Sequence, residues 1–453
     1  MTSRQDIPIQ VSRPVAGRLG DEVSPSPARS WLMAIFIAML TILSVMDRNI
    51  IALFLDQIRT DLAMSEVEAS IIYGGAFAIT FSLVGLPAGW AVDRMSRRKV
   101  MFAGVITWSL ATMACGLATG FRSMLAARAA VGAGEAVLAP SAHAIISDSF
   151  PPEKRTLPFA FYSMGQKAGA AIALIAGGFL ATLFAPQQMF EVVEGLQFKG
   201  WQIILFVIAA PGVFFALLIF AFAEPPRATG TDQARQVGYK QYFPHLKRHW
   251  RFYFGHHLGF IMAQSVYVAI LAWSPAYFTR VFGWSASDVG FKLGVALVAG
   301  PLISLPLHGW VCDHLFRRGV RDVHLRYQYV MLPIGVLPLC AGYLASSGGA
   351  AIVLLTLGLA LIAGSAAATT AALQLSVSSN LRGKAASIWV LSGGLASLVG
   401  PTSVALINEN LFAASNTIGT SLAIFVVVSL LLAVLLYEFA RREFGRIRPD
   451  AVP

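Results

Sequence analysis

Four charged residues interrupt long apolar stretches of this sequence, where a charge is costly. Asp47 and Arg48 lie in one stretch, and Arg128 and Glu135 lie in another. A charge at the centre of a bilayer costs about 2.5–3.5 kcal/mol on insertion scales, so these side chains should face a cavity or one another. Carboxylates in such places can carry protons, and arginines can pair with them or bind an anionic headgroup.

The spacing of these residues predicts their depth in a membrane. At 1.5 Å rise per residue, Asp47 lies about 24 Å along an outward-running first span, and Arg128 lies about 8 Å along an inward-running fourth span. The two therefore reach a similar depth and can pair if the helices are neighbours. Glu135 follows Arg128 by seven residues, which places it on the same helix face about 10 Å deeper, near the midplane.

Other polar residues in apolar stretches are weaker candidates. Lys167 can be a cavity cation for a phosphate or carboxylate, or a lysine that extends its amine to the membrane surface. Gln264, Tyr267 and Gln374 can line a polar cavity wall, although lone polar residues in membrane helices are more often partners in helix–helix hydrogen bonds. The glycines beside Glu135 have a packing explanation, because small residues let membrane helices approach closely.

The composition excludes a soluble protein. Of 453 residues, 56% are hydrophobic and 13% are charged, whereas a soluble domain averages about 25% charged residues. A membrane-spanning helix needs roughly 20 largely apolar residues, and twelve stretches meet this need. The predicted spans are 31–55, 68–92, 99–119, 123–147, 158–184, 201–222, 251–279, 289–312, 327–346, 350–377, 385–408 and 416–439. The fold class is therefore an all-α membrane protein.

The basic residues predict the orientation. With both termini in the cytoplasm, the inside segments hold 26 of the 34 Lys and Arg residues, and the outside loops hold only Arg59, Arg122, Lys199 and Arg280. This asymmetry satisfies the positive-inside rule for an even number of spans. The net charge of +11 thus follows from topology, and no nucleic-acid partner is expected.

The chain divides into five predicted segments: a disordered cytoplasmic tail (1–30), a six-helix bundle (31–222), a cytoplasmic linker (223–250), a second six-helix bundle (251–439) and a short tail (440–453). The three cysteines lie in apolar stretches, so no disulfide framework is expected. Without a transit peptide or retention signal, a bacterial inner or plasma membrane is favoured.

An internal repeat supports two similar halves. The segment Gly89-Trp-Ala-Val-Asp93-Arg94-Met-Ser-Arg97-Arg98 recurs 220 residues later as Gly309-Trp-Val-Cys-Asp313-His314-Leu-Phe-Arg317-Arg318. A weaker repeat, shifted by about 230 residues, places Ser365 at the position of Glu135. Parallel repeats of this kind place a substrate cavity between the halves near the midplane. Ionisable groups are concentrated in the amino half, and the carboxyl half offers an apolar wall for an acyl chain.

The repeated pattern Gly-x-x-x-Asp-Arg-x-x-Arg-Arg resembles the signature loop of major facilitator transporters. The resemblance implies the major facilitator fold, with twelve transmembrane helices in two six-helix halves, and a latch whose Asp lies against a helix end of the opposite half. A helix amino terminus stabilises a carboxylate there. The implied latches are Asp93 with Arg94, Arg97 and Arg98, and Asp313 with Arg317 and Arg318; His314 replaces an Arg in the second.

The amino half also resembles the spinster transporters, and the carboxyl half does so only faintly. The likeness rests on Val45-Met46-Asp47-Arg48-Asn49-Ile50, Arg128-Ala-Ala-Val-Gly132-Ala-Gly134-Glu135-Ala136 and Phe150-Pro151-Pro152-Glu153-Lys154-Arg155. It implies transport of lysophospholipids or sphingolipids, linked in part to protons. Monomers are usual for the superfamily.

The expected mechanism is alternating access by rocking of the two halves, driven by protonation of Asp47 and Glu135. Protonation would release Arg128 or Arg48 for an anionic headgroup. An organic-anion or drug carrier of the same superfamily is the alternative. A membrane receptor or an enzyme is disfavoured, because the sequence shows no P-loop, metal-ligand spacing or nucleophile elbow. No metal or cofactor is predicted.

Overall fold

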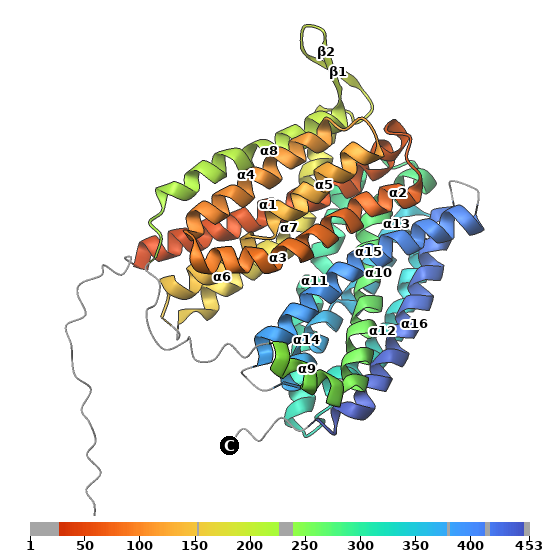
Figure 1. Ribbon diagram of the computed structural model, residues 1–453. Coiled ribbons are helices and arrows are strands. Elements are labelled where there is room, and N and C mark those ends of the chain that lie inside the picture. Colours follow the sequence, from red (N-terminus) through yellow and green to blue (C-terminus); the bar gives the residue numbers. More distant parts are fainter. Residues whose placement is uncertain (1–26, 152–153, 226–238, 378–380, 413–416, 448–453) are drawn as a thin grey trace, which may run out of the picture.

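The computed structural model describes residues 27–151, 154–225, 239–377, 381–412 and 417–447, and it arranges them as two bundles of long helices (Figure 1). The amino-half bundle contains α1 (Pro27–Asp61), α2 (Glu66–Ser70), the π-helix η1 (Ile71–Gly75), α3 (Ala76–Arg94), α4 (Arg97–Gly116), α5 (Phe121–Glu135), α6 (Leu138–Ser149), α7 (Thr156–Leu183), α8 (Gly200–Leu218) and the 3₁₀ turn η3 (Ile219–Ala221). Several of these join end to end, so the bundle has six crossings.

The carboxyl-half bundle also has six crossings. Its helices are α10 (Trp250–Phe282), α11 (Ala286–Arg317), α12 (Val323–Tyr343), α13 (Gly348–Ile362), α14 (Ser365–Leu375), α15 (Arg382–Leu411) and α16 (Ile418–Phe444). The short helix α9 (Tyr239–Arg248) precedes this bundle and falls within the predicted linker 223–250. Residues 226–238 of that linker, and residues 1–26 of the predicted tail, lie outside the described residues.

Eleven helices in the described ranges are long and apolar enough to cross a membrane. The twelfth crossing is α12, whose first turns carry His324, Arg326 and Gln328 and are therefore less apolar. Gln328 is fully buried in spite of its polarity, and its side chain is satisfied by bonds to the His324 carbonyl and the Ser365 hydroxyl. The predicted count of twelve spans agrees with this architecture.

The structure differs from the sequence prediction mainly at the ends and interruptions of helices. The first helix begins at Pro27 and continues to Asp61, beyond the predicted span 31–55, because polar residues extend a helix past the apolar core without any hydropathy signal. A β-hairpin of β1 (Met189–Val193) and β2 (Leu196–Lys199) was not predicted. Gly195 lies at its turn with a φ of +79°, a conformation that favours glycine.

The two bundles meet on one side of the molecule and diverge toward the other (Figure 1). We call the side that carries β1 and β2 the hairpin side, and the side where α1 begins and α16 ends the terminal side. Toward the hairpin side, α7 and α11 approach so closely that a Cβ on Gly290 would lie 2.4 Å from the Leu174 carbonyl oxygen and 2.7 Å from the Gly178 Cα. Glycine at this crossing therefore permits backbone contact between the halves.

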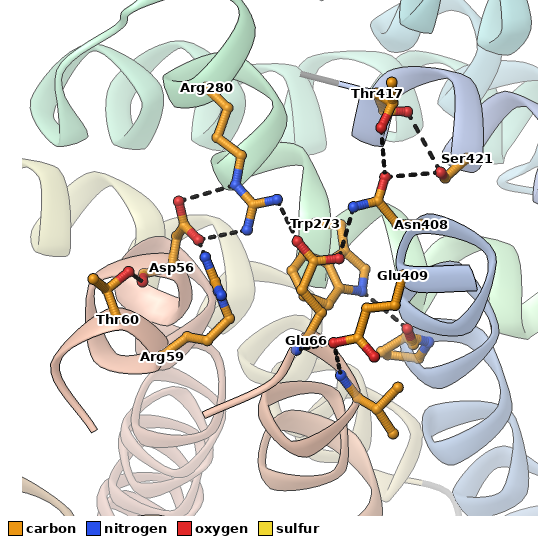
Figure 2. A network of polar contacts seen from close by, with 12 residues as sticks. Asp56, Arg59, Thr60, Glu66, Trp273, Arg280, Asn408, Glu409, Thr417 and Ser421 are labelled. Carbon is orange, nitrogen blue, oxygen red and sulfur yellow. Dashed lines mark hydrogen bonds and ion pairs between the residues drawn. The ribbon is translucent and has the colours of Figure 1, made fainter. Parts of the chain in front are cut away.

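A polar network joins the halves on the hairpin side (Figure 2). Arg280 of α10 donates to Asp56 of α1 through Nη2 at 2.5 Å and Nε at 3.0 Å, and to Glu66 of α2 through Nη1 at 2.5 Å. The side chains of Arg280 and Glu66 are only 8% and 9% exposed. Desolvation makes such a pair sensitive to loss of one partner, because the remaining charge is left uncompensated.

The residues of α15 extend this network. Asn408 Nδ2 donates to Glu66 Oε2 at 2.8 Å, and its Oδ1 accepts from Ser421 at 3.0 Å. Glu409 of the carboxyl half accepts the backbone N–H groups of Glu66 and Val67. It thereby satisfies unpaired donors at the amino terminus of α2, where the helix dipole also favours a carboxylate. The start of α2 is thus capped by the opposite half.

We predict that Arg280→Gln opens the hairpin side. Removing one partner of a buried ion pair costs about 3–5 kcal/mol, and this cost falls only on the arrangement in which the halves touch. Distances between spin labels on α2 and α15 should shift to longer values. Arg59→Gln is the matched control, because Arg59 pairs with Asp56 within α1 and does not cross between halves. Equal shifts in both variants would contradict the assignment.

A second prediction concerns the α7–α11 crossing. Gly290→Ala adds a Cβ that would meet backbone atoms of α7 below 3 Å, so the same spin-label measurement should show separation of the halves on the hairpin side. Gly349→Ala, on α13, places its Cβ where no atom lies within 4 Å and should leave the distances unchanged. An unaltered Gly290→Ala distribution would show that the contact is not required for closure.

Candidate functional site

A polar cavity of about 390 Å³ lies among α1, η1, α3, α5, α6, α7, α10 and α15. Arg48, Glu135, Gln264 and Tyr267 line it, so four of the residues singled out in the sequence lie around one space. The amino half contributes both charged side chains. The carboxyl half contributes the amide and the phenol from α10.

Arg48 and Glu135 form an ion pair at the edge of this cavity. Arg48 Nη2 lies 2.5 Å from Glu135 Oε2, and the same oxygen accepts the Ser44 hydroxyl at 2.8 Å. Glu135 is buried, whereas the Arg48 side chain is 34% exposed. The Arg48 guanidinium also lies 4.2 Å from the centre of the Phe77 ring, and this cation–π contact stabilises its charge. The acid is therefore enclosed and the cation is accessible.

Close helix packing fixes the position of Glu135. Gly132 and Gly134 precede it, and a Cβ at Gly132 would lie 2.5 Å from the Phe77 carbonyl oxygen, while one at Gly134 would lie 2.6 Å from the Trp108 backbone nitrogen. The two glycines thus let α5 approach α3 and α4 at backbone distance, as the packing explanation of the sequence anticipates. Glu135 is the last residue of α5, and this contact holds it beside α1.

Asp47 lies beside this pair but makes a different set of contacts. It is fully buried, and neither carboxylate oxygen accepts a hydrogen bond from the part of the chain that the structure describes. The ion pair with Arg128 that the depth argument allows does not form within 4 Å among these residues; Arg48, one position along, pairs with Glu135 instead. Helical rotation decides this, because adjacent residues on a helix point about 100° apart.

Arg128 donates hydrogen bonds to three backbone carbonyl oxygens. Its Nε donates to Ile72 at 3.2 Å, and its Nη2 donates to Tyr73 at 3.3 Å and to Arg48 at 3.4 Å. Ile72 and Tyr73 belong to the π-helix η1, and π-helical turns often occur at functional sites. Arg128 is fully buried and joins α1, η1 and α5, so in this arrangement it positions the wall and does not line the cavity.

A second, apolar cavity of about 590 Å³ adjoins the polar one. Its wall comes from α7 and from helices of the carboxyl half, including Met164, Leu302 and Leu359. Gln264 and Tyr267 line both cavities, so the two spaces meet at α10. Together they form a region with a cation at one end and aliphatic side chains at the other.

The remaining cavity candidates lie elsewhere. Gln374 is on α14, and it is not among the residues that line either cavity. Lys167 is on α7, and its side chain lies outside the described part of the structure. Ser365, the repeat counterpart of Glu135, lines the apolar cavity and donates to Gln328 at 2.7 Å. The two repeat positions thus carry an ion pair in one half and a neutral hydrogen bond in the other.

The basic loop after α3 is held by acids of the amino half. Arg97 lies 2.5 Å from Asp148, and Arg98 donates to the Phe222 carbonyl at 2.8 Å. Glu224 accepts from the Ser96 hydroxyl and the Arg97 backbone. Burial acts to raise the pKa of Glu224, but these hydrogen bonds and the charges of the two arginines hold it below its ordinary value.

The acids of the two repeated motifs are both exposed on the terminal side. Asp93 and Arg94 end α3, and Arg94 lies over the Trp90 ring at 4.7 Å. Asp313, Arg317 and Arg318 lie in and just after the last turns of α11, and all three are exposed.

Several residues of the site escaped the sequence interpretation. Ser44, Tyr73 and Phe77 line the polar cavity, but a serine or an aromatic in an apolar helix carries no distinctive signal. The hairpin-side network was missed because Arg280 counted only as one of the few outside cations. The small number of cations on the outer side is a signal in the sequence that Arg280 has a specific acidic partner.

Comparison with known proteins identifies the family. The model of the Major Facilitator Superfamily matches residues 37–401. A D-galactonate transporter of Escherichia coli O6:H1 is 27% identical over 335 residues, which cover 69% of this chain and 71% of that protein. Protein spinster of Drosophila melanogaster is 26% identical over 297 residues, covering 64% of this chain and 46% of that protein.

A solved structure shares the fold. A bacterial homologue of the human lysosomal transporter spinster, in an inward-facing and occupied conformation, superimposes with a TM-score of 0.80 at 23% identity, covering 94% of this chain and 99% of that one. With the family model spanning most of the sequence and both six-helix bundles reproduced, this chain belongs to the Major Facilitator Superfamily of membrane transporters.

Proposed function

We propose that this transporter carries an amphipathic lipid of the lysophospholipid or sphingolipid type by proton-coupled alternating access. The observation that supports this substrate class is the junction of the two cavities at Gln264 and Tyr267. A molecule with a charged head and a single long chain would place the head beside Arg48 and the chain in the apolar cavity. Each buried CH₂ group would contribute about 0.8 kcal/mol.

Arg48 is the proposed headgroup cation. Its guanidinium is partly exposed to the polar cavity while it pairs with Glu135, and guanidinium groups bind phosphate oxygens through two parallel hydrogen bonds. Protonation of Glu135 would remove the ion pair and release Arg48 for the substrate. Arg128 serves in this proposal as the clamp that keeps α1 and η1 in register.

Asp47 is the second proposed proton carrier. A carboxylate charge is costly in a buried place, and Asp47 is fully buried and forms no ion pair within 4 Å among the described residues. Proton uptake or release there would therefore be tied to a change in its surroundings. Rocking of the two halves would supply that change, with the loops of Asp93 and Asp313 acting as latches on the terminal side.

The orientation follows from charge. We propose that the terminal side faces the cytoplasm in a bacterial inner or plasma membrane, since Arg94, Arg317 and Arg441 lie at helix ends there and cytoplasmic loops carry an excess of Lys and Arg. The network of Figure 2 then closes the outer side, and the structure corresponds to an inward-facing state.

A second candidate is an organic anion such as a sugar acid. It is favoured by the likeness to a D-galactonate transporter, because Arg48 could bind a carboxylate as well as a phosphate. A small hydrophilic anion would occupy the polar cavity alone and would make no use of the apolar one. The two candidates therefore differ in their dependence on the apolar wall.

Transport by purified protein in vesicles separates these candidates. Uptake of a labelled lysophospholipid and of labelled galactonate would be compared with and without a pH gradient. Leu302→Gln adds a polar amide to the apolar cavity, so we expect it to reduce lysophospholipid uptake about fivefold or more, since burying an unpaired amide costs about 1–3 kcal/mol. Leu337→Gln is the control, because Leu337 is 71% exposed on α12 and lines neither cavity. Galactonate uptake without lysophospholipid uptake would establish the second candidate.

Glu135→Gln tests the coupling. The amide mimics the protonated acid, so this variant should bind substrate with little change and should lose uptake driven by the pH gradient. Glu194→Gln, in the exposed turn of the hairpin, should behave as the unaltered protein. Binding by fluorescence titration and uptake by radioactivity are the measurements. If gradient-driven uptake by Glu135→Gln remained intact, Glu135 would not be a proton carrier.

A further inference from the structure

An exposed surface of aromatic and basic residues lies where α9 meets α10. Phe243, Trp250 and Phe254 are 62%, 53% and 52% exposed, and Lys247, Arg248 and Arg251 are exposed among them. These six residues are called the junction surface. Neither cavity includes any of them, so the surface is separate from the proposed transport site.

The opposite face of α9 attaches it to the carboxyl half. Tyr242 is fully buried and Leu246 packs against the core. The His245 ring Nε2 lies 3.2 Å from the Ser376 carbonyl oxygen, just after α14, and Figure 1 shows α9 beside the terminal end of that helix. Because these contacts fix the inner face, the junction surface is held outward.

The cations of the junction surface make no ion pair with the described residues. Arg251 lies over the Trp250 ring at 5.8 Å, and it has no acidic partner among the described residues. The nearby end of α16 differs, because Arg442 pairs with Glu438 at 2.8 Å and Arg446 with Glu443 at 3.6 Å. Three positive charges that form no ion pair within the described part of the chain therefore adjoin three exposed rings, and this combination fits a partner that is anionic and also apolar.

The position of the surface identifies that partner. Trp250 is the first residue of α10, a helix long and apolar enough to cross the membrane, so the junction surface lies where that helix leaves the apolar layer. Tryptophan and phenylalanine are stable at this level of a bilayer, and lysine and arginine extend to the phosphates. A short basic helix with an aromatic face commonly lies in the plane of that interface.

We propose that the junction surface is a binding site for anionic phospholipid headgroups in the leaflet on the terminal side. Lys247, Arg248 and Arg251 would hold the phosphates through charge-assisted hydrogen bonds. Phe243, Trp250 and Phe254 would lie among the glycerol and upper acyl groups. The bound lipids would fasten α9, and with it the connection between the two halves, to the membrane.

The site can be tested by quenching of Trp250 fluorescence in bilayers that contain brominated lipids. The contribution of Trp250 is the difference between the unaltered protein and Trp250→Phe. We expect brominated phosphatidylglycerol to quench this contribution more strongly than brominated phosphatidylcholine does, and the preference should weaken with added salt. Equal quenching by the two lipids would overturn the proposal, as would shielding of Trp250 from both, which would indicate a second protein copy on the surface.

Charge variants identify the residues responsible. Each cation near an anionic surface contributes about a fivefold gain in association, so Lys247→Gln, Arg248→Gln and Arg251→Gln should each lower the preference, and together they should abolish it. The control combines Arg442→Gln with Arg446→Gln, which removes paired cations and should retain the preference. Loss of preference in the control, or retention in the triple variant, would contradict the assignment.

Discussion

The cost of a charge away from water determines how the amino half of this protein is built. Glu135 is buried near the middle of its bundle, and it is tolerated there because Arg48 and Ser44 donate to the same carboxylate oxygen. The pair in turn requires that α5 stay close to α3 and α4, which Gly132 and Gly134 permit. Arg128 is equally enclosed and is stabilised by carbonyls of η1 and α1. The π-helix, the glycine contacts and the direction of α1 thus all contribute to stabilising Glu135 and Arg128 away from water.

The same constraint accounts for the seal between the halves. Arg280, Asp56 and Glu66 are largely withdrawn from water where the bundles meet on the hairpin side (Figure 2). Such a contact fixes which residues meet but contributes little net free energy, because the desolvation cost offsets much of the attraction between charges. A carrier that must open and close benefits from a seal of this kind, since either state can then be favoured by a few kcal/mol.

The two cavities divide the chemistry between the halves. The amino half supplies ionisable groups, and α7 with the carboxyl half supplies an aliphatic wall. Ser365, at the repeat position of Glu135, forms a neutral hydrogen bond with Gln328, so the duplicated architecture retains the position but not the charge. In the proposed function, this asymmetric interior holds an asymmetric ligand with one polar end. Outside the cavities, the junction surface carries cations that form no ion pair with the described residues, and the lipid site proposed there is separate from the proposed transport site.

The sequence by itself determined the membrane class, the twelve crossings and the two halves, and it predicted as candidates Arg48, Glu135, Gln264 and Tyr267, which line one cavity in the structure. These properties depend on the length of apolar stretches, on an internal repeat and on the rarity of charged residues in apolar helices. All three can be read from the order of residues alone. Only the tertiary structure decided that Arg48, and not the adjacent Asp47, forms an ion pair within 4 Å among the described residues, because neighbouring residues on a helix point about 100° apart. It also decided that Arg280 joins Asp56 and Glu66, since residues more than 200 positions apart become partners only through the packing of whole helices.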